Sequence, residues 1–191
     1  MPCDINDVGL TLEGIQQISN LSRILAAIGT RPKNIWCSPL RRTRATLEHL
    51  NVFCPDFAKA TVAFDDRLIE RQRGYEAAAF ADLQLYLALN PRELAQKKRC
   101  PPLHYAPPGG ESLRDVRVQA GLLLQEILVE SRYGDNLVVT HHSVISLLRS
   151  QLEKWPESDF LTKLIGDKPP NCGVVVYNSV GDAVSLVSCS W

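Results

Sequence analysis

A histidine stands where a short apolar run, Asn136–Val139, gives way to a helical pattern of apolar residues. Such a run is typical of a buried strand, and the ligands of open parallel sheets bind beyond the carboxyl ends of the strands. His141 is therefore a candidate for catalysis or ligand binding. Successive residues leaving a strand point to opposite sides, so we expect His142 to pack against the protein or to face solvent.

A second predicted strand is also followed by a predicted helix, and arginines lie in the first turn of that helix. The run Asn34–Cys37 is typical of a buried strand, and the next two residues predict a helix start, with Ser38 as the N-cap and Pro39 at the first helical position. The predicted helix reaches about Leu50. Free N–H groups at a helix start favour an anion, and a guanidinium matches a phosphoryl group. Ser38 and Arg42 are therefore candidate phosphate-binding residues.

A carboxylate in a polar loop is the third candidate. Glu70 follows the apolar pair Leu68–Ile69, which we expect to anchor this loop. In isolation a solvated surface acid is the simpler interpretation. A carboxyl held beside a histidine can instead act as a general acid, a role worth roughly 10²–10⁴ in rate. His141 and Glu70 thus form the candidate catalytic pair, whereas His49 and His104 lack such a context.

Strands that alternate with helices predict an α/β layered domain. Thr11 and Gly29 should bound the first helix, and Ser112 with Asp115 should cap a later one. We expect a single domain over residues 1–191, with a helical insertion around 75–110 that could serve as a lid. The remaining expected elements are a strand at Thr61–Phe64, helices at Ala77–Leu89 and Arg92–Lys98, and an edge hairpin of Gly173–Tyr177 and Ala183–Cys189.

The charge balance, the cysteine spacing and the lack of a targeting segment limit which partners and which cellular compartment we expect. The 21 basic residues balance the 21 acidic ones, which gives no global electrostatic reason to expect nucleic acid or membrane as a partner. The six cysteines are dispersed without a Cys-x-x-Cys pair, so a zinc ribbon or redox motif is unsupported. The sequence offers no cluster of metal ligands either, and we expect neither a metal nor a cofactor. The chain shows no signal-peptide pattern and no apolar run long enough to span a bilayer. We expect a cytoplasmic protein with reduced thiols.

Five short motifs follow one another along nearly the whole chain. They are Leu10-Thr11-x-x-Gly14-x-x-Gln17, Cys37-Ser38-Pro39-Leu40-x-Arg42-x-x-x-Thr46, Leu68-x-Glu70-x-x-x-Gly74, Pro107-Pro108-Gly109-Gly110-Glu111-Ser112 and Val138-Val139-Thr140-His141. In this order they resemble the histidine phosphatase superfamily, the phosphoglycerate mutase-like group. The resemblance implies a three-layer fold, with a mostly parallel sheet flanked by helices on both faces.

The resemblance also implies roles for single residues. Arg42 matches a phosphate-binding arginine, and His141 matches the second histidine of the family, which binds the phosphoryl group and stabilises its transfer. Glu70 matches the usual proton donor. The implied ligand is phosphate or a small phosphorylated molecule, and phosphoryl transfer through histidine needs no metal in this family.

The chain departs from the family pattern at its start. The family's first central strand ends in Arg-His-Gly, whose histidine is the nucleophile. This tripeptide occurs nowhere in the sequence, so we expect the first central strand to be missing from this chain. The leading hypothesis is a phosphomonoesterase-type protein that is weak or inactive as the chain stands. A second is an active phosphatase with a truncated or wrongly assigned N-terminus. A third is a non-catalytic binding or scaffold protein of the same fold, in which a homo-oligomer or a partner donates a strand.

Overall fold

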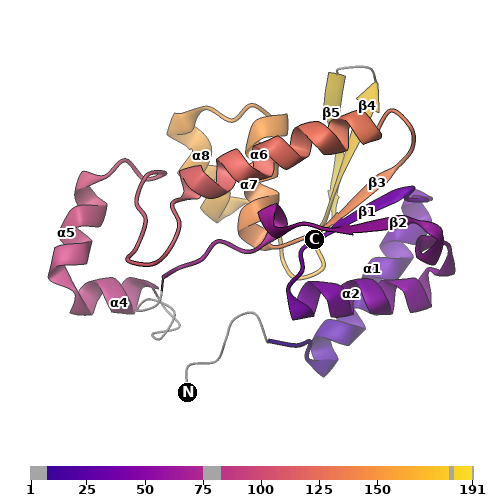
Figure 1. Cartoon of the computed structure of the whole chain (residues 1–191), viewed down its shortest axis with the longest axis horizontal. Coiled ribbons are helices and arrows are strands. Elements are labelled where there is room, and N and C mark those ends of the chain that lie inside the picture. Colours follow the sequence, from indigo (N-terminus) through magenta and orange to yellow (C-terminus); the bar gives the residue numbers. More distant parts are fainter. Residues whose placement is uncertain (1–7, 75–82, 181–182, 191) are drawn as a thin grey trace.

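The computed structural model describes residues 8–74, 83–180 and 183–190, and it has an α/β architecture (Figure 1). The elements in chain order are α1 (Leu12–Ile28), β1 (Asn34–Cys37), α2 (Arg41–Phe53), η1 (Pro55–Lys59), β2 (Thr61–Phe64), η2 (Asp66–Leu68), α4 (Leu83–Leu89), α5 (Pro91–Arg99), α6 (Leu113–Glu130), β3 (Asn136–Val139), α7 (His142–Leu152), α8 (Glu157–Gly166), β4 (Val174–Val180) and β5 (Ala183–Ser190).

A parallel sheet of order β2-β1-β3 forms the centre of the molecule. In Figure 1, α1 and α2 lie below this sheet and α6 lies above it. A hydrophobic core lies on each face of the sheet, and alternate residues of β3 point into the two cores. Val138 packs with α6 and α7, whereas Leu137 and Val139 pack with α1 and α2. The predicted parallel sheet with helices on both faces is confirmed.

The predicted helix caps are present. Thr11 accepts a hydrogen bond from the backbone N–H of Gly14 at 3.1 Å, and Gly29 ends α1 with a φ of 75°. This left-handed conformation suits glycine because no Cβ crowds the backbone. Ser112 and Asp115 form a reciprocal capping box at the start of α6.

The predicted start of α2, with Ser38 as the N-cap and Pro39 at the first helical position, is wrong. The helix begins at Arg41 with Leu40 in the cap position, and no side chain caps it. Pro39 biases the preceding residue toward an extended backbone. Ser38 therefore lies just past the end of β1 with its side chain fully buried, and its hydroxyl contacts His141 Nε2 at 2.9 Å and the Leu40 N–H at 3.5 Å. The helix also extends to Phe53, past the expected end near Leu50.

The C-terminal hairpin is present, but its expected place at the edge of the main sheet is wrong for the part of the chain described. β4 and β5 pair antiparallel in a two-stranded sheet of their own. Side chains hold this hairpin against the helices, since the Tyr177 hydroxyl donates to Glu153 at 2.6 Å and Ser179 bonds Ser131 at 3.1 Å. Within the described residues, β3 is paired along one edge only, with β1.

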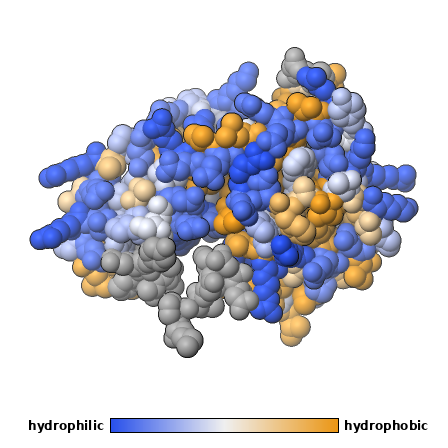
Figure 2. Space-filling view, in the orientation of Figure 1, coloured by the Kyte–Doolittle hydropathy of each residue, from blue (hydrophilic) through white to orange (hydrophobic). Residues whose placement is uncertain are grey.

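Helices α4 and α5 lie to one side of the layered body (Figure 1). The expected helix over Ala77–Leu89 lies partly outside the described residues, and α4 covers its last part, Leu83–Leu89. Tyr86, Leu87 and Tyr105 form a small core of their own here. α5 contributes no buried residue, and Figure 2 shows hydrophilic residues over this side of the molecule.

None of the helices described in residues 8–74, 83–180 and 183–190 is long and apolar enough to cross a membrane.

Candidate functional site

The turn that follows β1 is held rigidly at the carboxyl end of the sheet. The backbone N–H of Ser38 donates to the Val139 carbonyl at 2.9 Å, which continues the pairing of β1 with β3. The Thr43 hydroxyl lies 2.8 Å from the Ser38 carbonyl and 2.7 Å from that of Leu40. Thr43 thereby joins the first turn of α2 to the end of β1. This contact fixes the position from which the Arg42 side chain projects.

His141 lies two residues after the end of β3, and its side chain joins the two strand ends. It is the N-cap residue of α7, with an extended backbone, and its side chain is buried. Its Nδ1 atom lies 3.1 Å from Nη2 of Arg42, and its Nε2 atom lies 2.9 Å from Oγ of Ser38. Three predicted site residues from two separate segments therefore form one continuous contact chain.

These contacts fix the protonation state of the ring. A guanidinium can only donate hydrogen bonds, so Nδ1 accepts from Arg42, and the neutral ring carries its proton on Nε2, which donates to Ser38. Burial, reinforced by the Arg42 charge, lowers the pKa of His141 to about 4, although Glu70 acts in the opposite direction. His141 is neutral at pH 7 in this arrangement. Burial likewise lowers the pKa of Arg42, against the effect of Glu70.

Glu70 reaches the site from the connection between β2 and the α4–α5 segment. The Thr140 hydroxyl donates to the Leu68 carbonyl at 2.7 Å, which holds this connection beside the end of β3. Leu68 itself is fully buried in the core, as expected for an anchor. Glu70 is then near enough to raise the pKa of both Arg42 and His141. The site thus combines a cation, a neutral imidazole and a carboxylate.

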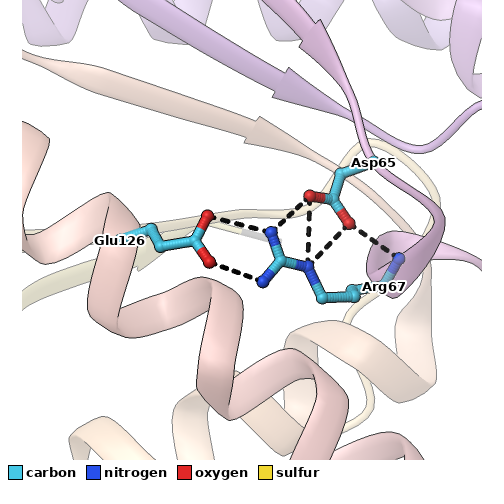
Figure 3. A network of polar contacts seen from close by, with 3 residues as sticks. All are labelled: Asp65, Arg67 and Glu126. Atoms are coloured by element: carbon cyan, nitrogen blue, oxygen red, sulfur yellow. Dashed lines mark hydrogen bonds and ion pairs between the residues drawn. The ribbon is translucent and has the colours of Figure 1, made fainter.

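An ion-pair network fixes the start of the same connection. Figure 3 shows the Arg67 guanidinium between the carboxylates of Asp65 and Glu126. Its nitrogens lie 2.6 Å from both Asp65 Oδ2 and Glu126 Oε1. Because Glu126 belongs to α6, the network joins the end of β2 to the helix layer above the sheet.

The other histidines differ in their placement. His142 is half-buried at the first position of α7, and its Nε2 atom is buried without a hydrogen-bond partner. Burial lowers its pKa too, while Glu70 raises it. His49 lies on α2, and His104 is exposed in the loop before α6. Among the described residues, no group of three or more His, Cys, Asp or Glu side chains could hold a metal ion.

Sequence reasoning missed Thr43 and Thr140, the two hydroxyls that fasten the strand ends. Thr43 lies one turn after Ser38, so a hydroxyl search around the turn would have found it. Thr140 bonds a residue 72 positions away, and no local pattern indicates such a contact.

The depressed pKa of His141 predicts a pH dependence of stability. The unfolded chain binds a proton near pH 6.5 and the folded protein only near pH 4, so the free energy of unfolding should rise with pH across this window. The full effect is about 3 kcal/mol. Urea unfolding at several pH values should show a smaller rise in the His141→Asn variant, in which His142 and the carboxylates are retained. An identical rise in both proteins would contradict the prediction.

Comparison with known proteins assigns the chain to a family. The family model for the histidine phosphatase superfamily (branch 1) matches residues 3–191. No curated protein matches the chain.

Three solved structures show the same fold, and they cover 94–97% of this chain. YhfR of Bacillus stearothermophilus is 23% identical with a TM-score of 0.70 and 83% of its own chain covered. The alpha-ribazole phosphatase of Shigella flexneri is 18% identical, with a TM-score of 0.72, 96% of this chain and 84% of its own chain covered.

The third is a mycobacterial glucosyl-3-phosphoglycerate phosphatase in complex with inorganic phosphate, which is 20% identical with a TM-score of 0.71, 97% of this chain and 87% of its own chain covered. At these identities the structures establish the fold, and the family model establishes the membership. The chain belongs to the histidine phosphatase superfamily.

Proposed function

We propose that this chain binds phosphate or a small phosphorylated molecule through Arg42 and His141, and that it is a weak or inactive phosphatase as it stands. The observation that carries the proposal is the engagement of both ring nitrogens of His141, by Arg42 at 3.1 Å and by Ser38 at 2.9 Å. The arrangement favours binding over nucleophilic attack by His141.

The chemical reason lies in the single lone pair of a neutral imidazole. Attack on phosphorus needs this lone pair, and the Arg42 guanidinium already occupies it at Nδ1. The Nε2 proton, which donates to Ser38 in this structure, can instead donate to a phosphoryl oxygen, while Arg42 orients the ring through Nδ1. Without a second histidine as nucleophile, the expected loss of rate is on the order of 10⁶.

The remaining predicted roles fit this proposal. Glu70 is the candidate proton donor, and the α4–α5 segment, within the insertion expected around 75–110, is a candidate lid on a single domain. The mycobacterial relative was solved with phosphate and with VO3, which supports a pocket for tetrahedral or related oxyanions in proteins of this fold. The cytoplasmic location stays a prediction.

Parallel measurements of binding and turnover test the proposal. Isothermal titration with inorganic phosphate should give a saturable signal that is lost in Arg42→Ala. Hydrolysis of p-nitrophenyl phosphate by the purified chain should not exceed that of His141→Asn. Robust turnover that both Arg42→Ala and His141→Ala abolish would overturn the assignment as a weak or inactive enzyme, and it would favour the active phosphatase.

A second candidate is a scaffold that accepts a strand from another chain. It is supported by β3, which within the described residues pairs along one edge only, and by the separate β4–β5 sheet nearby. β3 and β4 both pack on the core of α1 and α2, through Leu137, Val139 and Val174. Light scattering at increasing concentration tests self-association by this route, and a monomer at all concentrations counts against a homo-oligomer.

A further inference from the structure

Two loops meet at the base of the α4–α5 segment, and hydrogen bonds join them. We call residues 70–74 and 105–111 the neck. The backbone N–H of Glu111 donates to the Gln72 carbonyl at 3.0 Å, and the N–H of Gln72 donates to Glu111 Oε2 at 3.0 Å. Gly74 has a φ of 86°, and a Cβ there would collide with the Pro108 carbonyl. The two loops are therefore in direct backbone contact.

Arg71 spans the neck with its side chain. Its Nε atom donates to the Glu111 carbonyl at 2.8 Å, and its Nη2 atom donates to the Tyr105 carbonyl at 3.3 Å. Tyr105 belongs to the small buried core of the α4–α5 segment. A guanidinium presents several donors in a fixed fork, so one side chain can fix two carbonyls at once. Arg71 thus connects two parts of the neck. It bonds the loop that contains Glu70 to residues 105–111, which follow α5.

The backbone of the same residue holds Glu70. The Arg71 N–H donates to Glu70 Oε1 at 3.0 Å. The loop that carries Glu70 lies beside the end of β3, because the Thr140 hydroxyl donates to the Leu68 carbonyl at 2.7 Å, and Glu70 there affects the pKa of Arg42 and His141. A carboxylate beside an anion site repels phosphate, and the repulsion grows as the separation shrinks. The position of Glu70 should consequently set the affinity of the site for an anion.

We propose that Arg71 is a positioning residue that holds Glu70 at the phosphate site and links it to the α4–α5 segment. Through this link, a displacement of α4–α5 changes anion affinity without touching Arg42 or His141. The proposal rests on the proposed function only in taking phosphate as the ligand of that site.

A double-mutant cycle between Glu70 and Arg71 tests the link. Glu70→Gln should tighten phosphate binding about threefold to tenfold at pH 7, because it removes a nearby negative charge. Arg71→Lys keeps the charge but loses the fork on the two carbonyls, so it should tighten binding in the same direction. In the Glu70→Gln background, Arg71→Lys should have no further effect, since it acts through Glu70. Arg73→Lys, two residues along the same loop, is the matched control and should leave affinity unchanged.

Two results would overturn the proposal. Weaker binding in Arg71→Lys would mean that Arg71 contacts the anion itself. An equal effect of Arg71→Lys in both backgrounds would mean that Glu70 is not the intermediary. Gly74→Ala offers a second perturbation of the neck without any change of charge, and it should also tighten binding.

Hydrogen exchange separates this proposal from the proposed function. The Arg71 and Gln72 amides, which bond Glu70 and Glu111, should exchange at least about tenfold faster in Arg71→Lys. Unchanged exchange overturns the positioning role whether or not phosphate binds. A wild-type protein that does not bind phosphate, yet shows the faster exchange in the variant, overturns the proposed function alone.

Discussion

Phosphate affinity is expected to fall about 100-fold when Arg42 is replaced by alanine. Arg42 is half-buried at the start of α2, and its guanidinium lies 3.1 Å from His141. A hydrogen bond to a charged group contributes about 1.5–3 kcal/mol, and a fork that binds an anion through two donors gives more than one such bond. Arg42→Lys keeps the charge without the fork, so it should lose about tenfold.

Titration calorimetry with inorganic phosphate measures these losses, and Arg41→Ala is the matched control. Arg41 is the preceding residue and is exposed, so its removal should cost less than about threefold. Equal losses for Arg41→Ala and Arg42→Ala would show that only net charge matters. An NMR titration adds an independent signal, because removal of the Arg42 charge should raise the pKa of His141.

Glu153→Ala is expected to destabilise the fold by about 3–5 kcal/mol, since it removes the nearer carboxylate from a buried arginine, Arg149. Glu153 accepts from Arg149 Nε at 2.9 Å, from Trp155 Nε1 at 2.8 Å and from the Tyr177 hydroxyl at 2.6 Å. The Arg149 side chain is only 5% exposed. The Glu153 carboxylate therefore accepts hydrogen bonds from α7, from the turn that follows α7 and from the C-terminal hairpin.

Urea unfolding followed by tryptophan fluorescence measures this loss. Asp167→Ala is the control, because Asp167 lies 3.8 Å from Arg149 and is 54% exposed, so its loss should cost less than about 0.5 kcal/mol. Tyr177→Phe removes only the hydroxyl that joins the hairpin to Glu153 and should cost about 1 kcal/mol. A loss in Glu153→Ala no larger than in Asp167→Ala would contradict the assigned role of the network.

Local sequence patterns predict the helices and strands of this fold well, because the residues that start and end each element lie close to it in the sequence. The spacing of apolar residues, the caps at Thr11 and Ser112, and the left-handed Gly29 all depend on neighbours within one helical turn. The strand-to-helix junctions also place Arg42 and His141 at one edge of the sheet, and the structure brings these two side chains into contact. Their chemical roles remain predictions.

Patterns of this kind fail where a residue has a distant partner. Ser38 has the residue type and spacing of an N-cap, yet its hydroxyl bonds His141, which lies 103 positions away. Arg71 resembles a surface charge in its polar loop, yet it binds two carbonyls across the neck. The same limit explains the hairpin, since the pattern of β4 and β5 predicts their mutual pairing but not the sheet to which they belong.

One strand of that hairpin, β5, is expected to affect how the protein behaves at high concentration. β5 contains neither a charged residue nor a proline, and Leu186 and Val187 are 45% and 61% exposed. Proteins usually protect such an edge with lysine, proline or a bulge, because its backbone is a template for another chain. β5 itself carries such a bulge at Val187, which is left without a partner because Val176 pairs with Ser188 and Tyr177 pairs with Leu186. A bulge, and no charge, therefore interrupts the edge of β5, and Val187→Lys, which adds a charge at the bulge, is expected to reduce association in concentrated samples.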